Sequence, residues 1–142
     1  MTTTGSAADI IGIRYETLRN WLKIGLLSGN RNDNPGRRKW RSYSPGDLAR
    51  IRLVKDALDA ALALDVAIDV SNDAEVIAHL DNLTAEPVAA GPYVMIWPGL
   101  PEAQFMIAAS HQIAQEIRRN PAPVVIFDLS HTVSRVRQPN AS

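Results

Sequence analysis

The densest group of charged side chains in this sequence is the run Arg37-Arg38-Lys39, followed by Trp40 and Arg41. Guanidinium and ammonium groups in such a cluster can neutralise phosphate oxygens, which is the chemistry of nucleic-acid backbone contacts. Taken alone, the run is better explained as a solvated charged surface. Its meaning therefore depends on the elements that position it.

The formal net charge of the 142 residues is zero, but the charge is divided unequally along the chain. Residues 1–55 contain 11 basic and 4 acidic side chains, a balance of +7, whereas residues 56–142 carry a balance of −7. Such an asymmetry is typical of a basic binding module joined to a body with another task. The zero total does not argue against a nucleic-acid partner.

Two short helices joined by a glycine turn are predicted before the basic run. Residues 5–11 form the first, with Ser6 as its N-cap, and it ends at Gly12, which can adopt the positive φ of a tight turn. Residues 15–24 have apolar side chains at helical spacing and a polar outer face, which predicts the second helix.

The second helix is predicted to end at Gly25, after which Leu26 and Leu27 form a short apolar strand. Residues 28–44 contain the turn signal Asn-Pro-Gly between two extended segments, which indicates a β-hairpin with a long loop. Ser44-Pro45 then opens a third helix that is expected to run into the low sixties.

These residues resemble the DNA-binding head of the MerR superfamily. The match lies in two blocks, ADIIGIRYETLRNWLKIGLL at 8–27 and RRKWRSYSPGDLARIRLV at 37–54, and covers roughly residues 6–62. The resemblance implies a winged helix-turn-helix that binds double-stranded DNA. Its second helix would enter the major groove and its hairpin would contact the phosphate backbone.

The resemblance also implies which side chains face DNA. On the recognition helix these are Thr17, Arg19, Asn20 and Lys23, and in the wing Arg38, Arg41 and Tyr43. Neighbouring side chains extend both groups: Arg14 and Tyr15 at the start of the helix, and Arg37 and Lys39 in the hairpin. Trp21 and Trp40 are interpreted as packing residues rather than base-stacking ones.

The sequence departs from the family in three places. Arg14-Tyr15 replaces the usual small polar N-cap, and Asn20-Trp21 replaces the usual aromatic pair. The long C-terminal helix through which subunits of the family pair is not evident. The family's mode of dimerisation and of effector binding is therefore not carried over.

After the head, the pattern is less regular. Residues 61–70 are compatible with either strand or helix, and Asn72-Asp73-Ala74-Glu75 is typical of a helix start with a capping box. Residues 84–92, bracketed by Pro and Gly, are the predicted linker between a DNA-binding domain at 1–83 and a smaller segment at 93–142.

The last segment is predicted as strand 93–97, helix 101–119 and strand 124–129. The fold class is thus α+β, with a winged helix-turn-helix followed by a small β-α-β segment. Two short strands and one helix bury too little apolar surface to stand alone. We therefore expect residues 93–130 to complete a sheet by forming a homodimer.

Other chemistries lack support. The chain has no cysteine, and His79, His111 and His131 lie far apart, so no metal and no cofactor are expected. Asp128 at a strand end has no accompanying nucleophile or glycine-rich loop, so we interpret it as a cap of the following turn and expect no enzyme. No membrane segment or secretory signal is expected, which suits a cytoplasmic protein.

Three functions remain open on the sequence. The leading interpretation is a transcription regulator that binds duplex DNA as a homodimer, with RNA polymerase as a conceivable further contact. The second is an architectural, excisionase-like factor that bends DNA and binds direct repeats. The third is a protein-interaction module whose basic hairpin meets an acidic partner.

Overall fold

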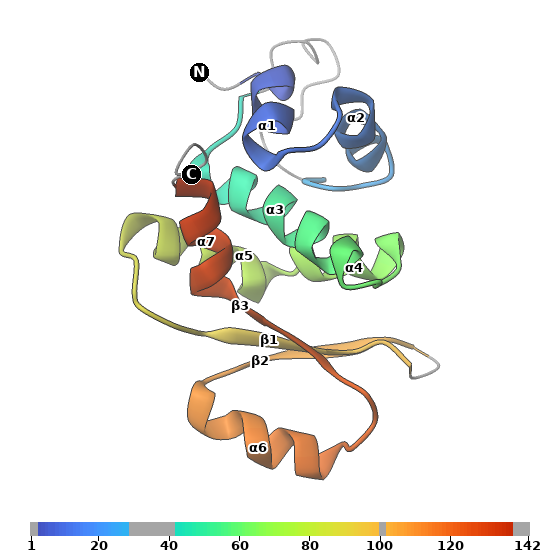
Figure 1. Cartoon of the computed structure of the whole chain (residues 1–142), viewed down its shortest axis with the longest axis vertical. Coiled ribbons are helices and arrows are strands. Elements are labelled where there is room, and N and C mark those ends of the chain that lie inside the picture. The colour runs from blue at the N-terminus through green and yellow to red at the C-terminus, as the bar shows by residue number, and fades with distance from the viewer. Residues whose placement is uncertain (1–2, 29–41, 100–101, 138–142) are drawn as a thin grey trace.

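The computed structural model describes residues 3–28, 42–99 and 102–137. The elements form a helical upper part and a small sheet with one helix below it (Figure 1). In chain order they are α1 (Thr4–Ile11), α2 (Tyr15–Lys23), α3 (Pro45–Asp59), α4 (Leu64–Ser71), α5 (Ala74–Ala85), β1 (Tyr93–Trp97), β2 (Gln104–Ala108), α6 (Ser110–Arg119), β3 (Val125–Asp128) and α7 (Leu129–Arg137).

The first two helices and their glycine turn are confirmed, with corrections at the ends. Gly12 adopts the left-handed conformation at φ 86°, but α1 begins earlier than predicted because Thr3, not Ser6, is its N-cap. The short strand expected at residues 26–27 is wrong. The chain turns there instead, with Leu27 at φ 62°, because both leucine side chains are needed in the core.

The third helix starts as predicted. The Ser44 hydroxyl accepts a hydrogen bond from the Asp47 N–H, the Asp47 carboxylate accepts one from the Ser44 N–H, and Pro45 occupies the first turn. The helix ends at Asp59 rather than in the low sixties, since Ala61 adopts a positive φ of 67°. In the ambiguous stretch 61–70, the residues from Leu64 onward are helical, as part of α4.

The prediction of one helix over residues 101–119 is wrong. Gln104–Ala108 is a strand, and only Ser110–Arg119 is helical. The strand pairs antiparallel with β1, placing Tyr93 opposite Ala108 and Trp97 opposite Gln104. The apolar residues at 105–107 are compatible with the periodicity of a helix and with that of a strand. They form a strand because they pair with β1.

The predicted β-α-β segment is therefore corrected to strand, strand, helix, strand, helix. The sheet is antiparallel throughout, with the order β2-β1-β3, and it is built from one chain. A second correction concerns residues 129–137, for which no element was predicted and which form α7. The expected α+β class stands, but completion of the sheet does not require a second subunit.

The sheet separates two apolar layers. On one face, Val94, Ile96 and Phe127 join the large cluster under α3, α5 and α7. On the other, Met95 and Trp97 pack with Ile113 of α6. Because side chains alternate along a strand, each strand serves both layers. The large cluster also contains residues of α1 and α2, so the head and the C-terminal segment share one core.

Candidate nucleic-acid interface

The recognition helix α2 presents a polar face to solvent and an apolar face to the core. Leu18 and Trp21 are buried, which confirms that Trp21 is a packing residue. The predicted DNA-contacting side chains fall on the open side: Thr17 is half-buried, and Arg14, Tyr15, Arg19, Asn20 and Lys23 are exposed. Glu16, which the prediction left out, is exposed on the same helix.

Arg19 lies against a neighbouring aromatic ring. Its guanidinium carbon is 5.6 Å from the centre of the Tyr15 ring, within the range of a cation–π interaction. Tyr15 is itself 45% exposed, so the pair stands on the surface. Stacking limits the rotamers of the long Arg19 side chain, and less conformational entropy is then lost when it contacts a partner.

The start of α2 confirms the first departure noted in the sequence. Arg14 occupies the N-cap position without a side-chain hydrogen bond to the helix. The first N–H groups of a helix have no acceptor within it, so here they are available to solvent or to an anion. A phosphate beside this end would meet both these N–H groups and the exposed Arg14.

Of the predicted wing, residues 28–44, the structure describes only Ser28 and residues 42–44. Arg37, Arg38, Lys39, Trp40 and Arg41 lie outside the described residues, so their predicted positions stay predictions. Tyr43 is 5% exposed, and its hydroxyl is 2.8 Å from the Thr4 hydroxyl. The described contact of Tyr43 is thus with α1, and its role at phosphate stays a prediction.

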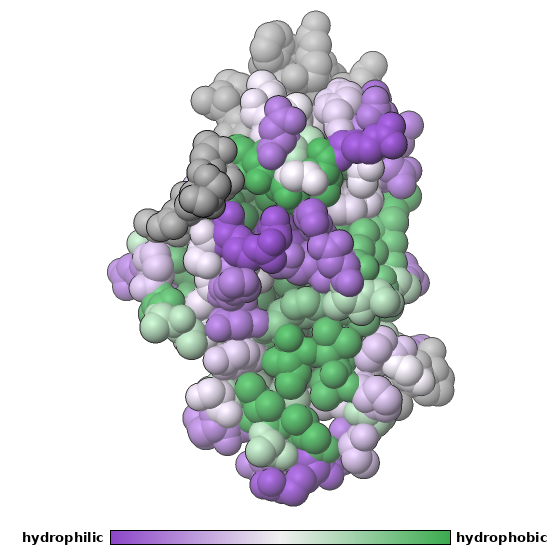
Figure 2. Space-filling model, viewed as in Figure 1, coloured by the Kyte–Doolittle hydropathy of each residue, from purple (hydrophilic) through white to green (hydrophobic). Residues whose placement is uncertain are grey.

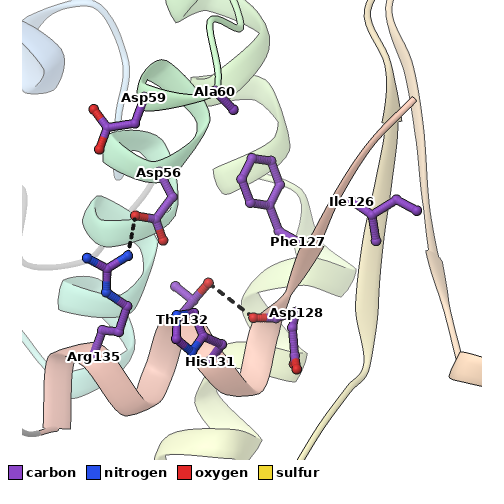
Figure 3. Close-up of a pocket in the computed structure, with 9 residues that line it drawn as sticks. All are labelled: Asp56, Asp59, Ala60, Ile126, Phe127, Asp128, His131, Thr132 and Arg135. Carbon is purple, nitrogen blue, oxygen red and sulfur yellow. Dashed lines mark hydrogen bonds and ion pairs between the residues drawn. The ribbon is translucent and has the colours of Figure 1, made fainter. Parts of the chain in front are cut away.

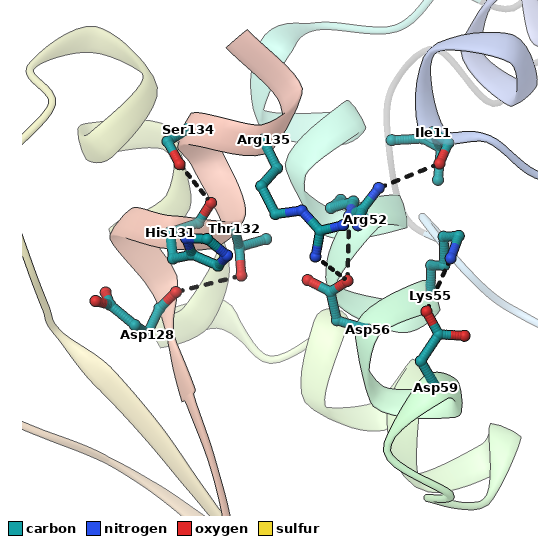
Figure 4. Close-up of polar contacts among 10 residues, drawn as sticks. All are labelled: Ile11, Arg52, Lys55, Asp56, Asp59, Asp128, His131, Thr132, Ser134 and Arg135. Carbon is teal, nitrogen blue, oxygen red and sulfur yellow. Dashed lines mark hydrogen bonds and ion pairs between the residues drawn. The ribbon is translucent and has the colours of Figure 1, made fainter. Parts of the chain in front are cut away.

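Some of the basic side chains that give residues 1–55 their positive charge balance are buried or paired with carboxylates. Arg50 and Arg52 are buried, at 5% and 8% exposure, and Lys55 pairs with Asp59 at 2.8 Å. Arg52 donates to Asp56 at 3.1 Å and to the Ile11 carbonyl at 3.3 Å (Figure 4). Arg52 thereby links α3 to α1, whereas the Lys55–Asp59 pair lies within α3. These cations add little to a DNA-facing surface.

Burial also affects two ionisable groups near the start of α3. It lowers the pKa of the Arg50 guanidinium, although the carboxylates of Asp47 and Asp81 act in the opposite direction. Burial and the nearby Asp47 charge raise the pKa of Asp81. The Asp81 carboxylate lies where a Cβ on Gly46 would be, so the glycine leaves room for this side chain of α5.

Asp128 is a structural cap, as predicted. Its Oδ1 accepts hydrogen bonds from the Ser130 N–H at 3.0 Å and the Gly91 N–H at 2.9 Å. It lines an open groove of 370 Å³ between α3, β3 and α7, together with Asp56, Asp59 and His131 (Figure 3). Asp56 and Asp59 are both engaged with basic side chains.

Within residues 3–28, 42–99 and 102–137, no group of three or more metal-ligating side chains is arranged to hold an ion. In the same part of the chain, no helix is long and apolar enough to cross a membrane.

The first half of the chain matches a known protein family. The model of the MerR HTH family regulatory proteins matches residues 2–73, half of the chain. Those residues contain the helix pair, the basic run, α3 and α4. No curated protein matches the chain, and residues 74–142 lie outside the family match.

Proposed function

Because the chain belongs to the MerR HTH family of regulatory proteins, which are non-enzymatic DNA-binding transcription regulators, we propose that it binds specific duplex sites as a homodimer. The observation that best supports this proposal is the exposed polar face of α2. Arg19, Asn20 and Lys23 stand there on a helix whose other face is buried.

We assign the contacts by chemistry. Arg19 and Asn20 can each form two hydrogen bonds to a base edge, to guanine and adenine respectively, and so are proposed to read sequence in the major groove. Arg14, Lys23 and the wing cations are proposed to contact phosphate, as is Tyr43. These contacts fix the position of the head without carrying sequence information.

A salt titration tests the phosphate contacts. If about five phosphates are neutralised per subunit, log K for a single half-site should fall with log salt at a slope of about −4 to −5. Filter binding or fluorescence anisotropy between 50 and 300 mM KCl would measure this slope. A slope near zero would contradict the proposed interface and would favour a protein-interaction module.

The homodimer is proposed to form through residues 93–130, at the β3 edge of the sheet. β3 has β1 on one side and no strand on the other within the described residues. The side chain of Ile126 on this edge strand is 37% exposed, and that of Ile117 on α6 is 37% exposed as well. None of the residues of α6 is fully buried. Figure 2 shows apolar surface on the side of the molecule where β3 and α6 lie.

Antiparallel pairing of two β3 strands across a twofold axis would cover both the unpaired edge of β3 and the exposed apolar side chains. It would give the unpaired backbone groups of each β3 a partner and make one sheet of the two. The α6 helices would then lie on the same face of that sheet, and the exposed Ile126 and Ile117 side chains would be covered. A twofold dimer would present two recognition helices to a palindromic site.

Ile126→Lys is expected to make the protein monomeric, because a charged side chain would be buried at the paired edge. Sedimentation velocity of the full chain should show a dimer for the wild type and a monomer for the variant. Val88→Lys, at a side chain that is 55% exposed, is the control and should leave the dimer intact. An unchanged dimer in Ile126→Lys would refute this interface.

Selection of bound sequences from random duplexes would test the function as a whole. Inverted half-sites at a fixed spacing would support a dimeric regulator. Direct repeats together with strong bending in a gel assay would instead favour the architectural factor.

A further inference from the structure

Asn72 connects the end of the recognition helix to the body of the protein. It follows α4 and precedes α5, yet its side chain contacts the turn after α2. Its Nδ2 donates to the Gly25 carbonyl at 2.8 Å, and its Oδ1 accepts from the Leu27 N–H at 3.1 Å. One amide side chain thus satisfies a donor and an acceptor of this turn.

The turn is one that needs such support. Gly25 and Leu27 both have positive φ, at 122° and 62°, and a leucine rarely adopts that conformation. Leu26 and Leu27 are nevertheless almost fully buried. Two kinds of contact keep this strained backbone in place. The core buries the side chains of Leu26 and Leu27, and Asn72 binds the Gly25 carbonyl and the Leu27 N–H.

Asn72 is itself held in place by α3. Arg50 donates from Nη2 to the Asn72 Oδ1 at 2.6 Å and from Nε to the Ser71 carbonyl at 2.9 Å. Ser71, which is fully buried, returns a hydrogen bond to the Arg50 carbonyl at 2.7 Å. The network fixes the amide plane of Asn72, so that its two ends meet the turn in one orientation.

Other polar contacts of the helix pair α1–α2 with the rest of the described chain are made by α1. Arg52 donates to the Ile11 carbonyl at the end of α1, and Tyr43 contacts Thr4 at its beginning. The helix α2 packs mainly on α1, so these links restrain it indirectly. Asn72 acts on the C-terminal end of α2 itself.

We propose that Asn72 is a positioning residue for DNA recognition, which orients α2 through the turn at Gly25–Leu27 without touching DNA. The inference rests on the proposed function, since it assigns α2 to the major groove. A small tilt of α2 would displace Arg19 and Asn20 from base edges. Phosphate contacts through long flexible side chains tolerate such a tilt better than bidentate base contacts do.

The test compares Asn72→Ala with the wild type on a selected specific duplex and on a random duplex. Specific affinity should fall at least tenfold, whereas non-specific affinity and the salt slope should stay unchanged, because the exposed cations are all retained. A variant that merely loosened the fold would weaken both duplexes together. Asn82→Ala, at an exposed asparagine on α5, is the matched control and should bind as the wild type does.

Asn72→Asp keeps the result interpretable if the alanine variant fails to fold. The carboxylate can still accept from Leu27 and Arg50 but cannot donate to the Gly25 carbonyl. We expect a smaller loss of specific affinity, with amide NMR shifts concentrated in residues 24–28. Wild-type specific affinity in a folded Asn72→Asp or Asn72→Ala protein would overturn the inference. A wild type that binds no duplex would instead refute the proposed function.

Discussion

Arg19→Ala is expected to lower the affinity for a specific duplex by about 5- to 150-fold, which corresponds to about 1–3 kcal/mol for one lost bidentate base contact. Arg19 is exposed on the polar face of α2 and is oriented by the Tyr15 ring, so alanine removes the contact without opening the core. Specificity should relax at the base pair that Arg19 reads. Anisotropy titrations against duplexes substituted at each position would measure both effects.

The comparison variants separate base reading from charge. Arg38→Ala and Arg41→Ala are expected to weaken binding less, evenly across sequences, and to reduce the salt slope by about one each. Arg118→Ala removes an exposed arginine of α6, remote in sequence from the head, and should have no effect on half-site binding. Unchanged affinity in Arg19→Ala would mean that a different face of α2 meets the DNA.

Leu129→Ala should destabilise the whole protein by about 2–5 kcal/mol, a large part of the roughly 5–15 kcal/mol available to a domain. Leu129 is fully buried at the start of α7 and belongs to the cluster that also contains Leu18 and Ile51. Its removal leaves a cavity where α7 packs on α3 and α5. Urea unfolding followed by circular dichroism and by tryptophan fluorescence would measure the loss.

The same experiment tests the domain boundaries predicted from the sequence. With one shared core, both probes should report a single transition in the wild type and in Leu129→Ala. Val88→Ala, at an exposed position before β1, should change stability by no more than about 0.5 kcal/mol. A separate early transition of residues 93–137, with the head still folded, would instead support two independent domains at 1–83 and 93–142.

Several features of the head could be predicted because their causes are local. Gly12 allows the left-handed turn between two helices, and Ser44-Pro45 with Asp47 completes a helix start within four residues. The apolar spacing in 15–24 decides which face of α2 is buried. A helix such as α7 could also have been found, since Leu129, Val133 and Val136 repeat at helical intervals after the cap at Asp128.

Other features depended on partners distant in the sequence. The segment at 104–108 is a strand because β1 lies beside it, and its own pattern also fits a helix. Arg50 and Arg52 contribute to the positive charge balance of residues 1–55. In the structure they are buried, and acceptors on Ser71, Asn72 and Ile11 bind them. Asn72 meets residues that precede it by 45 and 47 positions, and nothing in its neighbourhood along the chain indicates this contact.

By itself, then, the sequence determined the helix-turn-helix and its exposed polar face, because caps, turns and amphipathic spacing act over a few residues. Only the tertiary structure decided which cations remain on the surface, how three strands of one chain pair into an antiparallel sheet, and what holds the recognition helix at its end. Each of these features depends on contacts between residues that are far apart in the sequence. Burial of the shared apolar core determines which of these residues come together.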